Sequence, residues 1–305
     1  MEILPIISKM AVLVLLMLTG FACARLGLTG PEFNQKVTPV VLNVLLVATI
    51  LNSVVSAESF VQGVVLLEYL GLMAAMFCIS MLIAWLTARL LRRNRDDEGV
   101  LRTTVMFMNN AFVGFPVVAA VFGEQAVFYA AISNIPFNIL LYTVGTAQLD
   151  RTGEGHIEWK RIFTPPLIAT LVAAALYVSR VSVPQVLGDT ISMFAGATIP
   201  MSMLIVGTSL GAIPIGKALG NPRVYIAAAV RLLAVPVIVW AVFRLFVTDP
   251  LMLGIPVLIA ACPAAMIITP LCISRGKDET LASGIIFIST VLCAVTMPFL
   301  AWLLF

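Results

Sequence analysis

The chain has 305 residues, of which 61% are hydrophobic and 11% are charged, and its mean hydropathy is +1.08. A water-soluble globular domain of this composition would aggregate, so the composition excludes that class and predicts an integral membrane protein whose main partner is the lipid bilayer. The formal charge of +3 is distributed over many loops, and no nucleic-acid partner is predicted.

The segments that cross the membrane are predicted to be helices. A helix needs about 20 apolar residues to cross the hydrocarbon core, whereas a barrel strand alternates in polarity over about ten residues. Runs such as 11–24 and 224–242 are apolar on all sides. Hydropathy and the positions of Pro, Gly and charged residues predict ten spans at 4–24, 37–56, 64–90, 103–122, 126–147, 163–180, 186–213, 223–247, 251–273 and 281–304.

Basic residues are unevenly distributed over the loops between these spans. Fourteen of the eighteen lie in the odd-numbered connections, three lie on the opposite side, and Arg231 lies inside the eighth span. Short loops rich in Lys and Arg stay in the cytoplasm. We therefore expect a multi-pass protein of the bacterial inner (cytoplasmic) membrane, with the odd-numbered connections cytoplasmic and both termini extracytoplasmic.

The ten predicted spans divide into two halves. Three pairs of prolines recur 154 to 161 residues apart: Pro5 and Pro165, Pro39 and Pro200, and Pro116 and Pro270. Because each half has an odd number of spans, the second half enters the membrane from the opposite side, as in the inverted repeats of alternating-access transporters. We predict a first five-helix repeat over residues 1–149, a cytoplasmic linker over 150–161 that contains His156, and a second five-helix repeat over 162–305.

The fourth span carries Asn109, Asn110, Gly114 and Pro116 within eight residues. Pro116 has no N–H and frees a carbonyl about one turn earlier, near Phe112, and Gly114 favours non-helical backbone there. At this depth, such backbone is tolerated only where it is packed in protein or lines a polar cavity. We predict a helix break whose two asparagines line a substrate-binding cavity; a proline kink with asparagines bonded to neighbouring helices is the alternative.

The ninth span carries Pro263, Thr269 and Pro270 at the corresponding place in the second half, and a second helix break is predicted there. Broken helices near the midplane bring partially positive N-termini and partially negative C-termini together, which can hold a carboxylate or replace the hydration shell of a cation. The sequence therefore predicts a crossover site for a small organic anion, with Thr269 among its ligands.

Two charged residues inside spans are further candidates. At a rise of about 1.5 Å per residue, Arg231 lies about 12 Å from the cytoplasmic end of its helix, where a permanently charged guanidinium requires water, a counter-charge or carbonyls. We predict that Arg231 assists substrate binding; capping of a neighbouring helix end or snorkelling is the alternative. Glu68 is a candidate for ion or proton coupling, which interfacial solvation explains equally well.

The remaining predictions concern what the protein lacks. No span contains an aspartate pair, a His-Glu-x-x-His motif, or a serine with a histidine to serve it, so an enzyme is not predicted. The five cysteines have neither disulfide nor metal-site spacing, and no cofactor is expected apart from a coupling ion such as H+ or Na+.

A channel or a sensory membrane subunit without carrier activity is the alternative to a transporter.

The sequence resembles those of the auxin efflux carrier family over nearly the whole chain. The resemblance is carried by Asn-Asn-Ala-Phe-Val-Gly-Phe-Pro at 109–116, by 200–210 and 231–236, and by Glu-Thr-Leu-Ala-Ser at 279–283 running on through 289–298. Bacterial members of this family carry small organic acids, and plant members export auxin. The architecture is related to that of bile acid:sodium symporters.

The resemblance implies ten spans in an inverted five-plus-five repeat, a scaffold domain and a transport domain each drawn from both repeats, a crossover of the fourth and ninth spans, and a homodimer. It also implies substrate contact for Asn109 and Asn110, with Asn134 and Asn138 of the fifth span beside the substrate. Ser202 of the seventh span belongs to the family pattern. One difference is that family members often place an asparagine shortly after the proline of the second break, where this chain has Ala-Ala-Met at 264–266.

Overall fold

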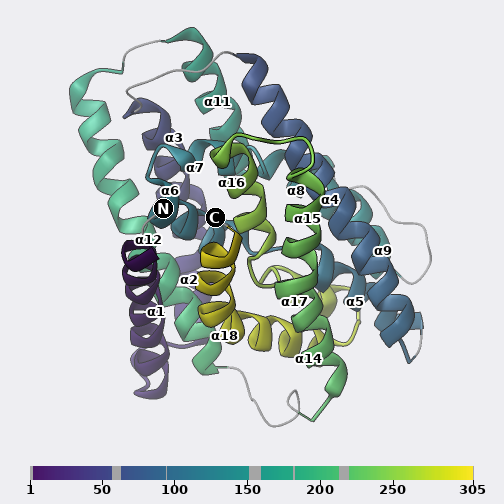
Figure 1. Cartoon of the computed structure of the whole chain (residues 1–305). Coiled ribbons are helices and arrows are strands. Elements are labelled where there is room, and N and C mark those ends of the chain that lie inside the picture. Colours follow the sequence, from purple (N-terminus) through teal and green to yellow (C-terminus); the bar gives the residue numbers. More distant parts are fainter. Residues whose placement is uncertain are drawn as a thin grey trace. The chain divides into compact units, whose positions relative to one another are not determined.

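The computed structural model describes residues 3–56, 63–93, 95–150, 159–180, 183–212 and 220–304. His156 and most of the predicted linker lie outside them. The described part of the chain is helical and contains no strand, only an isolated antiparallel bridge between Met108 and Ala264 (Figure 1). The predicted all-α class is confirmed.

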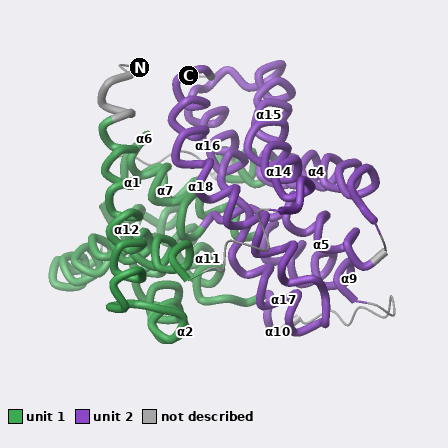
Figure 2. Tube along the Cα trace, turned by 90° about the horizontal axis from the view of Figure 1, so that it is seen from below, with its two compact units in different colours: residues 1–71, 111–135, 163–212 green, residues 72–110, 136–162, 213–305 purple. Residues whose placement is uncertain are grey.

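The chain forms two compact units (Figure 2). Unit 1 consists of residues 1–71, 111–135 and 163–212. Unit 2 consists of residues 72–110, 136–162 and 213–305. Each unit therefore contains segments from both halves of the sequence.

Unit 1 is built around the contact between its first and last helices, α1 and α12, which run side by side (Figure 1). Helix α3 packs against α12, α11 and α7. The elements of unit 1 are α1 (Ile3–Arg25), α2 (Pro31–Val40), the π-helical turn η1 (Val41–Leu45), α3 (Leu46–Val55), the start of α4 (Gly63–Leu91), α6 (Phe115–Phe122), α7 (Ala126–Ala131), α11 (Pro165–Ser179) and α12 (Gln185–Ala212).

Unit 2 is organised around α18 (Glu279–Leu304), which contacts α14 (Pro222–Ala229), α17 (Ile268–Ser274), α5 (Arg95–Met106) and the π-helical turn η4 (Val230–Ala234). A second π-helical turn, η2 (Asn110–Gly114), begins in unit 2 and continues into unit 1. The other elements of unit 2 are the rest of α4, α8 (Asn134–Leu140) apart from its first two residues, which belong to unit 1, η3 (Leu141–Gly145), α9 (Thr146–Leu149), α10 (Trp159–Ile162), α15 (Val235–Phe243) and α16 (Pro250–Ala260).

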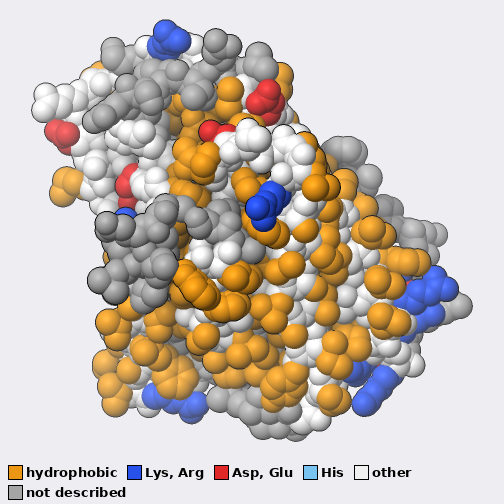
Figure 3. Space-filling view, in the orientation of Figure 1, with side chains coloured by type: hydrophobic (Ala, Val, Ile, Leu, Met, Phe, Trp, Pro, Cys, Tyr) orange, Lys and Arg blue, Asp and Glu red, His pale blue; other side chains and the backbone are white. Residues whose placement is uncertain are grey.

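Seven described helical segments are long and apolar enough to cross a membrane: Ser8–Arg25, Pro31–Val55, Val65–Leu91, Ala126–Leu149, Gln185–Ala212, Pro222–Phe243 and Glu279–Leu303. Three further apolar helices are shorter, namely Asn110–Phe122, Pro165–Ser179 and Pro250–Ala260. On the face drawn in Figure 3, hydrophobic side chains cover wide areas, and Lys and Arg gather in small groups. Such a surface suits lipid, because a water-soluble protein rarely exposes large continuous apolar patches.

Several helices begin at a polar cap followed by proline. The carboxylate of Asp249 accepts hydrogen bonds from the N–H groups of Leu251 (2.9 Å) and Met252 (2.8 Å) at the start of α16. Asn221 caps α14 and Thr164 caps α11 in the same way. Proline at the next position needs no N–H partner, and its fixed φ angle suits the first helical turn.

Removing the Asp249 cap is expected to cost about 0.5–2 kcal/mol of stability, because two N–H groups at the start of α16 lose their acceptor. Thermal unfolding of purified Asp249→Ala in detergent measures this loss. Asp249→Asn keeps an accepting oxygen and should remain close to the wild type. If the two variants unfold at the same temperature, the cap does not stabilise α16.

Candidate functional site: two helix breaks

The first helix break lies between α5 and η2. Helix α5 ends at Met106, residues 107–109 are not helical, and η2 leads directly into α6. The sequence placed the non-helical backbone near Phe112 and Gly114, and that position is wrong. Gly114 closes the π-helical turn, and Pro116 lies in the first turn of α6. A wide turn before proline accommodates its missing N–H, so the helix continues there.

The second break separates α16 from α17. Helix α16 ends at Ala260, residues 261–267 are not helical, and α17 begins at Ile268. Pro263 lies inside the break. Thr269 and Pro270 lie in the first turn of α17, where an N–H has no partner within the helix, so Pro270 starts a helix instead of interrupting one. Thr269 is half-buried.

The two breaks pair through their main chains. The N–H of Asn109 donates to the carbonyl of Pro263 (2.9 Å), and the N–H of Ala265 donates to the carbonyl of Phe107 (3.0 Å), so that Met108 lies opposite Ala264. We call residues 107–109 and 261–267 the paired breaks. Backbone groups that are not in a helix need other hydrogen-bond partners at membrane depth, and each break supplies such partners to the other.

Two side chains make further contacts with this region, one by a hydrogen bond and one by ring packing. The hydroxyl of Ser289, on α18, accepts a hydrogen bond from the N–H of Ala264 (3.2 Å). The ring of Phe107 packs edge-on against Phe137 of α8, with centroids 5.7 Å apart. In the sequence, Ser289 appears only within a segment shared with the family. The pattern of residues along α18 does not indicate that Ser289 contacts Ala264.

Arg231 lies at the centre of this arrangement and is fully buried, with 0% of its surface exposed. Its guanidinium donates to three carbonyl oxygens, those of Val105 (3.0 Å), Ala260 (2.6 Å) and Cys262 (3.1 Å). Val105 and Ala260 lie in the last turns of α5 and α16, where carbonyls have no partner in their own helix and carry a partial negative charge. Arg231 therefore caps the carbonyl ends of two helices at once, which is the alternative to substrate binding that the sequence left open.

Three of the predicted asparagines are buried in unit 2. Asn109 and Asn110 are 4% and 3% exposed and follow directly on the bridge at Met108. Asn138 is buried on α8, next to the Phe137 that packs on Phe107. The structure thus brings Asn109, Asn110 and Arg231 together at the paired breaks.

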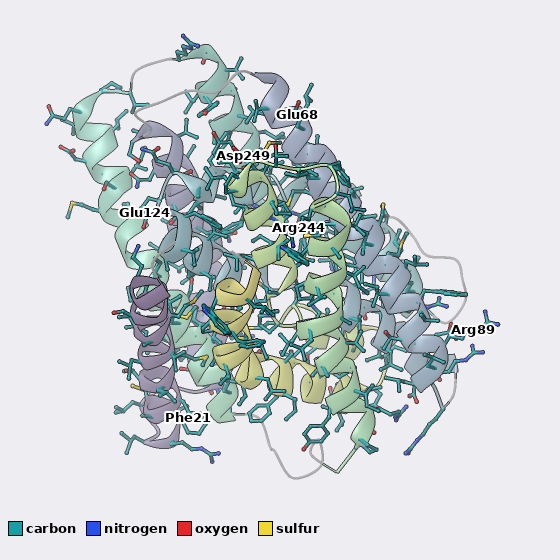
Figure 4. All side chains as sticks on the ribbon, in the orientation of Figure 1. Phe21, Glu68, Arg89, Glu124, Arg244 and Asp249 are labelled. Carbon is teal, nitrogen blue, oxygen red and sulfur yellow. The ribbon has the colours of Figure 1, made fainter. Side chains whose placement is uncertain are left out.

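Three other candidates belong to unit 1. The amide of Asn134 donates to the hydroxyl of Thr170 (3.4 Å). Ser202 is fully buried on α12, and its hydroxyl has no hydrogen-bond partner among the described residues. Glu68 is exposed near the start of α4 (Figure 4). For these residues a role in binding or coupling stays a prediction from the sequence.

Ion pairs link the ends of several helices of unit 2, and the sequence did not predict these pairs. Asp96 binds Lys277 (2.6 Å), Asp97 binds Arg223, and Asp150 binds Arg275 (2.8 Å). These residues lie at or next to helix ends that are far apart in the sequence. The pairs therefore place the ends of several helices on one side of unit 2.

Glu98 belongs to the same region and pairs with Arg92 and Arg102. Burial opposes its ionisation, but the hydrogen bond from Arg92 and the positive charges of Arg102, Arg92 and Arg89 outweigh it and lower the pKa of Glu98. A lowered pKa means that the ionised carboxylate stabilises the fold at pH values above the pKa that Glu98 has in the unfolded chain. This contribution disappears as the pH falls through the lower, folded value.

The chain is similar in sequence to known membrane transport proteins. The sequence matches the membrane transport protein family in two segments, residues 5–158 and 155–301. An uncharacterized transporter from Methanothermobacter thermautotrophicus is 28% identical over 296 residues, which are 95% of each chain. An uncharacterized transporter from Methanocaldococcus jannaschii is 23% identical over 303 residues, which are 96% of this chain and 97% of the other.

The family match covers nearly the whole chain, and the described helices include several that can cross a membrane. The protein is thus a multi-pass integral membrane protein with a transport function and is not an enzyme. It belongs to the membrane transport protein family, which is the auxin efflux carrier family that its sequence resembles.

Proposed function

We propose that the protein is a secondary transporter that moves a small organic anion across the membrane by alternating access, with the substrate bound at the paired breaks. The observation that carries this proposal is the hydrogen-bonded pairing of two helix breaks beside two buried asparagines and a buried arginine. Side chains and main-chain dipoles at interrupted helices form the substrate sites of many secondary transporters.

Electrostatics favours an anion. Arg231 and Asp97 are the buried charged residues of the described chain, and Asp97 is paired with Arg223. The acceptors of Arg231 are neutral carbonyls, so its positive charge is not cancelled by a carboxylate. The amide groups of Asn109 and Asn110 are suited to donate hydrogen bonds to carboxylate oxygens.

The ion pairs of unit 2 support the ten-span topology. In that topology Asp96 and Asp97 lie in the third connection, Asp150 in the fifth, Arg223 in the seventh, and Arg275 and Lys277 in the ninth. The three pairs join the third connection to the seventh and ninth, and the fifth to the ninth. Connections on one side of a membrane are separated by even numbers of crossings. This pattern agrees with the basic loops being cytoplasmic and both termini being extracytoplasmic, in the inner membrane.

The two-part organisation supports an inverted repeat. The family matches the chain in two segments that meet near residue 155, inside the predicted linker. Each compact unit contains parts of both halves, as expected for a scaffold domain and a transport domain. We assign the transport domain to unit 2, which holds the paired breaks, and the scaffold to unit 1, through which the protein would form a homodimer. Coupling to protons, sodium or the membrane potential would supply the driving force.

Replacing both asparagines by alanine tests the site. We expect Asn109→Ala/Asn110→Ala to lose saturable anion binding by roughly 10-fold or more, because hydrogen bonds to a charged group contribute about 1.5–3 kcal/mol each. Scintillation proximity with radiolabelled malonate and other short carboxylates on purified protein measures the affinity. Asn43→Ala is the matched control, because Asn43 is an exposed amide of unit 1.

Two results would contradict the proposal. Unchanged binding in the folded double variant would remove the site from the paired breaks. Unitary currents in planar bilayers, without saturable counterflow in proteoliposomes, would favour a channel over a carrier.

A further inference from the structure

The three carbonyls that surround Arg231 form an unusual acceptor set. Two of them close the C-terminal ends of α5 and α16, and the third, from Cys262, belongs to the second break. Helix C-termini carry partial negative charge, and unwound carbonyls beside them are the groups that coordinate Na+ in ion-coupled carriers. A metal cation could therefore occupy such a position.

In this protein the position is already taken by a side chain. The guanidinium contacts the three oxygens at 2.6–3.1 Å through Nε and both terminal nitrogens, and the residue has no exposed surface. An arginine stays protonated in proteins, so this charge is permanent. A second cation at the same oxygens would lie within a few ångströms of the first, where repulsion in a poorly polarisable interior is strong.

We propose that Arg231 is a built-in cation of the paired breaks, which holds both helix ends in place and replaces a coupling sodium ion there. Arg231 is then a positioning residue: it fixes α5 and α16 so that Asn109 and Asn110 meet the substrate. Anion binding at this site is consequently independent of sodium. The last statement rests on the proposed function, whereas the role of the built-in cation can be tested without any substrate.

The first test compares the thermal unfolding of the purified wild type in sodium chloride and in N-methyl-D-glucamine chloride at equal ionic strength. A built-in cation predicts the same melting temperature in both salts. A melting temperature that rises specifically with sodium would overturn the inference.

The second test removes the guanidinium. Arg231→Ala should lower the melting temperature by about 5 °C or more, because three buried carbonyls lose their donor. Millimolar methylguanidinium should restore part of this loss by entering the vacated space. Arg244→Ala is the control, since Arg244 is an exposed arginine directly after the end of the same long helix, with its guanidinium carbon 4.8 Å from the centre of the Trp240 ring (Figure 4). It should show neither the loss nor the rescue.

Further outcomes keep this inference separate from the proposed function. If Arg231→Ala does not fold, Arg231→Lys should fold with a melting temperature below that of the wild type, because it keeps the charge but not the three-way geometry. An alanine variant as stable as Arg244→Ala would refute the inference. Sodium-dependent malonate binding would refute it while leaving the transporter intact, and loss of the asparagine site alone would leave the built-in cation unaffected.

Discussion

Gly207→Ala is expected to destabilise unit 1 severely, although it adds a single methyl group. A Cβ atom at this position would overlap the carbonyl oxygen of Met17 and lie 2.7 Å from the amide nitrogen of Phe21. Both are main-chain atoms of α1, so no side chain can rotate away, and the two helices must separate. Overpacking typically costs 1–3 kcal/mol, and contact with backbone should place this variant at about 3 kcal/mol or more.

The effect should be large because the whole α1–α12 contact depends on small residues. Cβ atoms at Gly20 and Gly211 would also meet atoms of the opposite helix. Next to Gly207, the hydroxyl of Thr208 shares a hydrogen bond with Thr29 (3.0 Å), which separation of the helices would break. Close approach through glycines is a common mode of helix association in membranes.

Gly196→Ala provides the control on the same helix. Outside its own stretch of helix, no described atom lies within 4 Å of the position of its Cβ, and alanine favours helix over glycine, so this variant should be as stable as the wild type or slightly more stable. Melting curves in detergent, read by static light scattering or intrinsic fluorescence, compare the two variants. Equal melting temperatures for Gly207→Ala and Gly196→Ala would show that α1 does not approach α12 this closely.

Breaking the pair of Asp97 and Arg223 should have the second large effect. The two side chains are only 7% and 11% exposed, so either partner left alone is an unpaired charge largely shielded from water. Removal of one partner of a buried pair costs about 3–5 kcal/mol. Because Asp97 also accepts the N–H of Arg93 (3.4 Å), Asp97→Ala removes support from the start of α5 as well.

A double-mutant cycle separates the pair from its neighbours. Asp97→Ala/Arg223→Ala should be more stable than the sum of the single losses predicts, because it leaves no charge without its partner. Arg92→Ala is the comparison from the same region: its side chain is 42% exposed, and the loss of its pair with Glu98 should cost at most about 1 kcal/mol. Additive losses in the cycle would show that Asp97 and Arg223 do not interact in solution.

Much of the candidate site could be predicted residue by residue, but not its geometry. Asn109, Asn110 and the two proline-containing segments stand out because polar and helix-breaking residues are rare in apolar spans. The place where the first helix stops was predicted about one turn too late. Gly114 and Pro116 disfavour a regular α-helix, and a π-helical turn accommodates them. The helix stops instead at residues 107–109, which pair with residues about 155 positions later in the chain.

Composition and local hydropathy were enough to predict that the protein lies in a membrane, that it is helical and where its apolar segments fall, since each of these properties depends on one stretch of chain at a time. Helix packing, by contrast, selects the partners of Arg231, the acceptor for the Ala264 N–H and the ion pairs between distant helix ends. These contacts join residues 25 to 181 positions apart. A pattern along the chain records which groups need partners, but it contains no distances between segments, so the choice among many carbonyls and charges is made only when the helices pack.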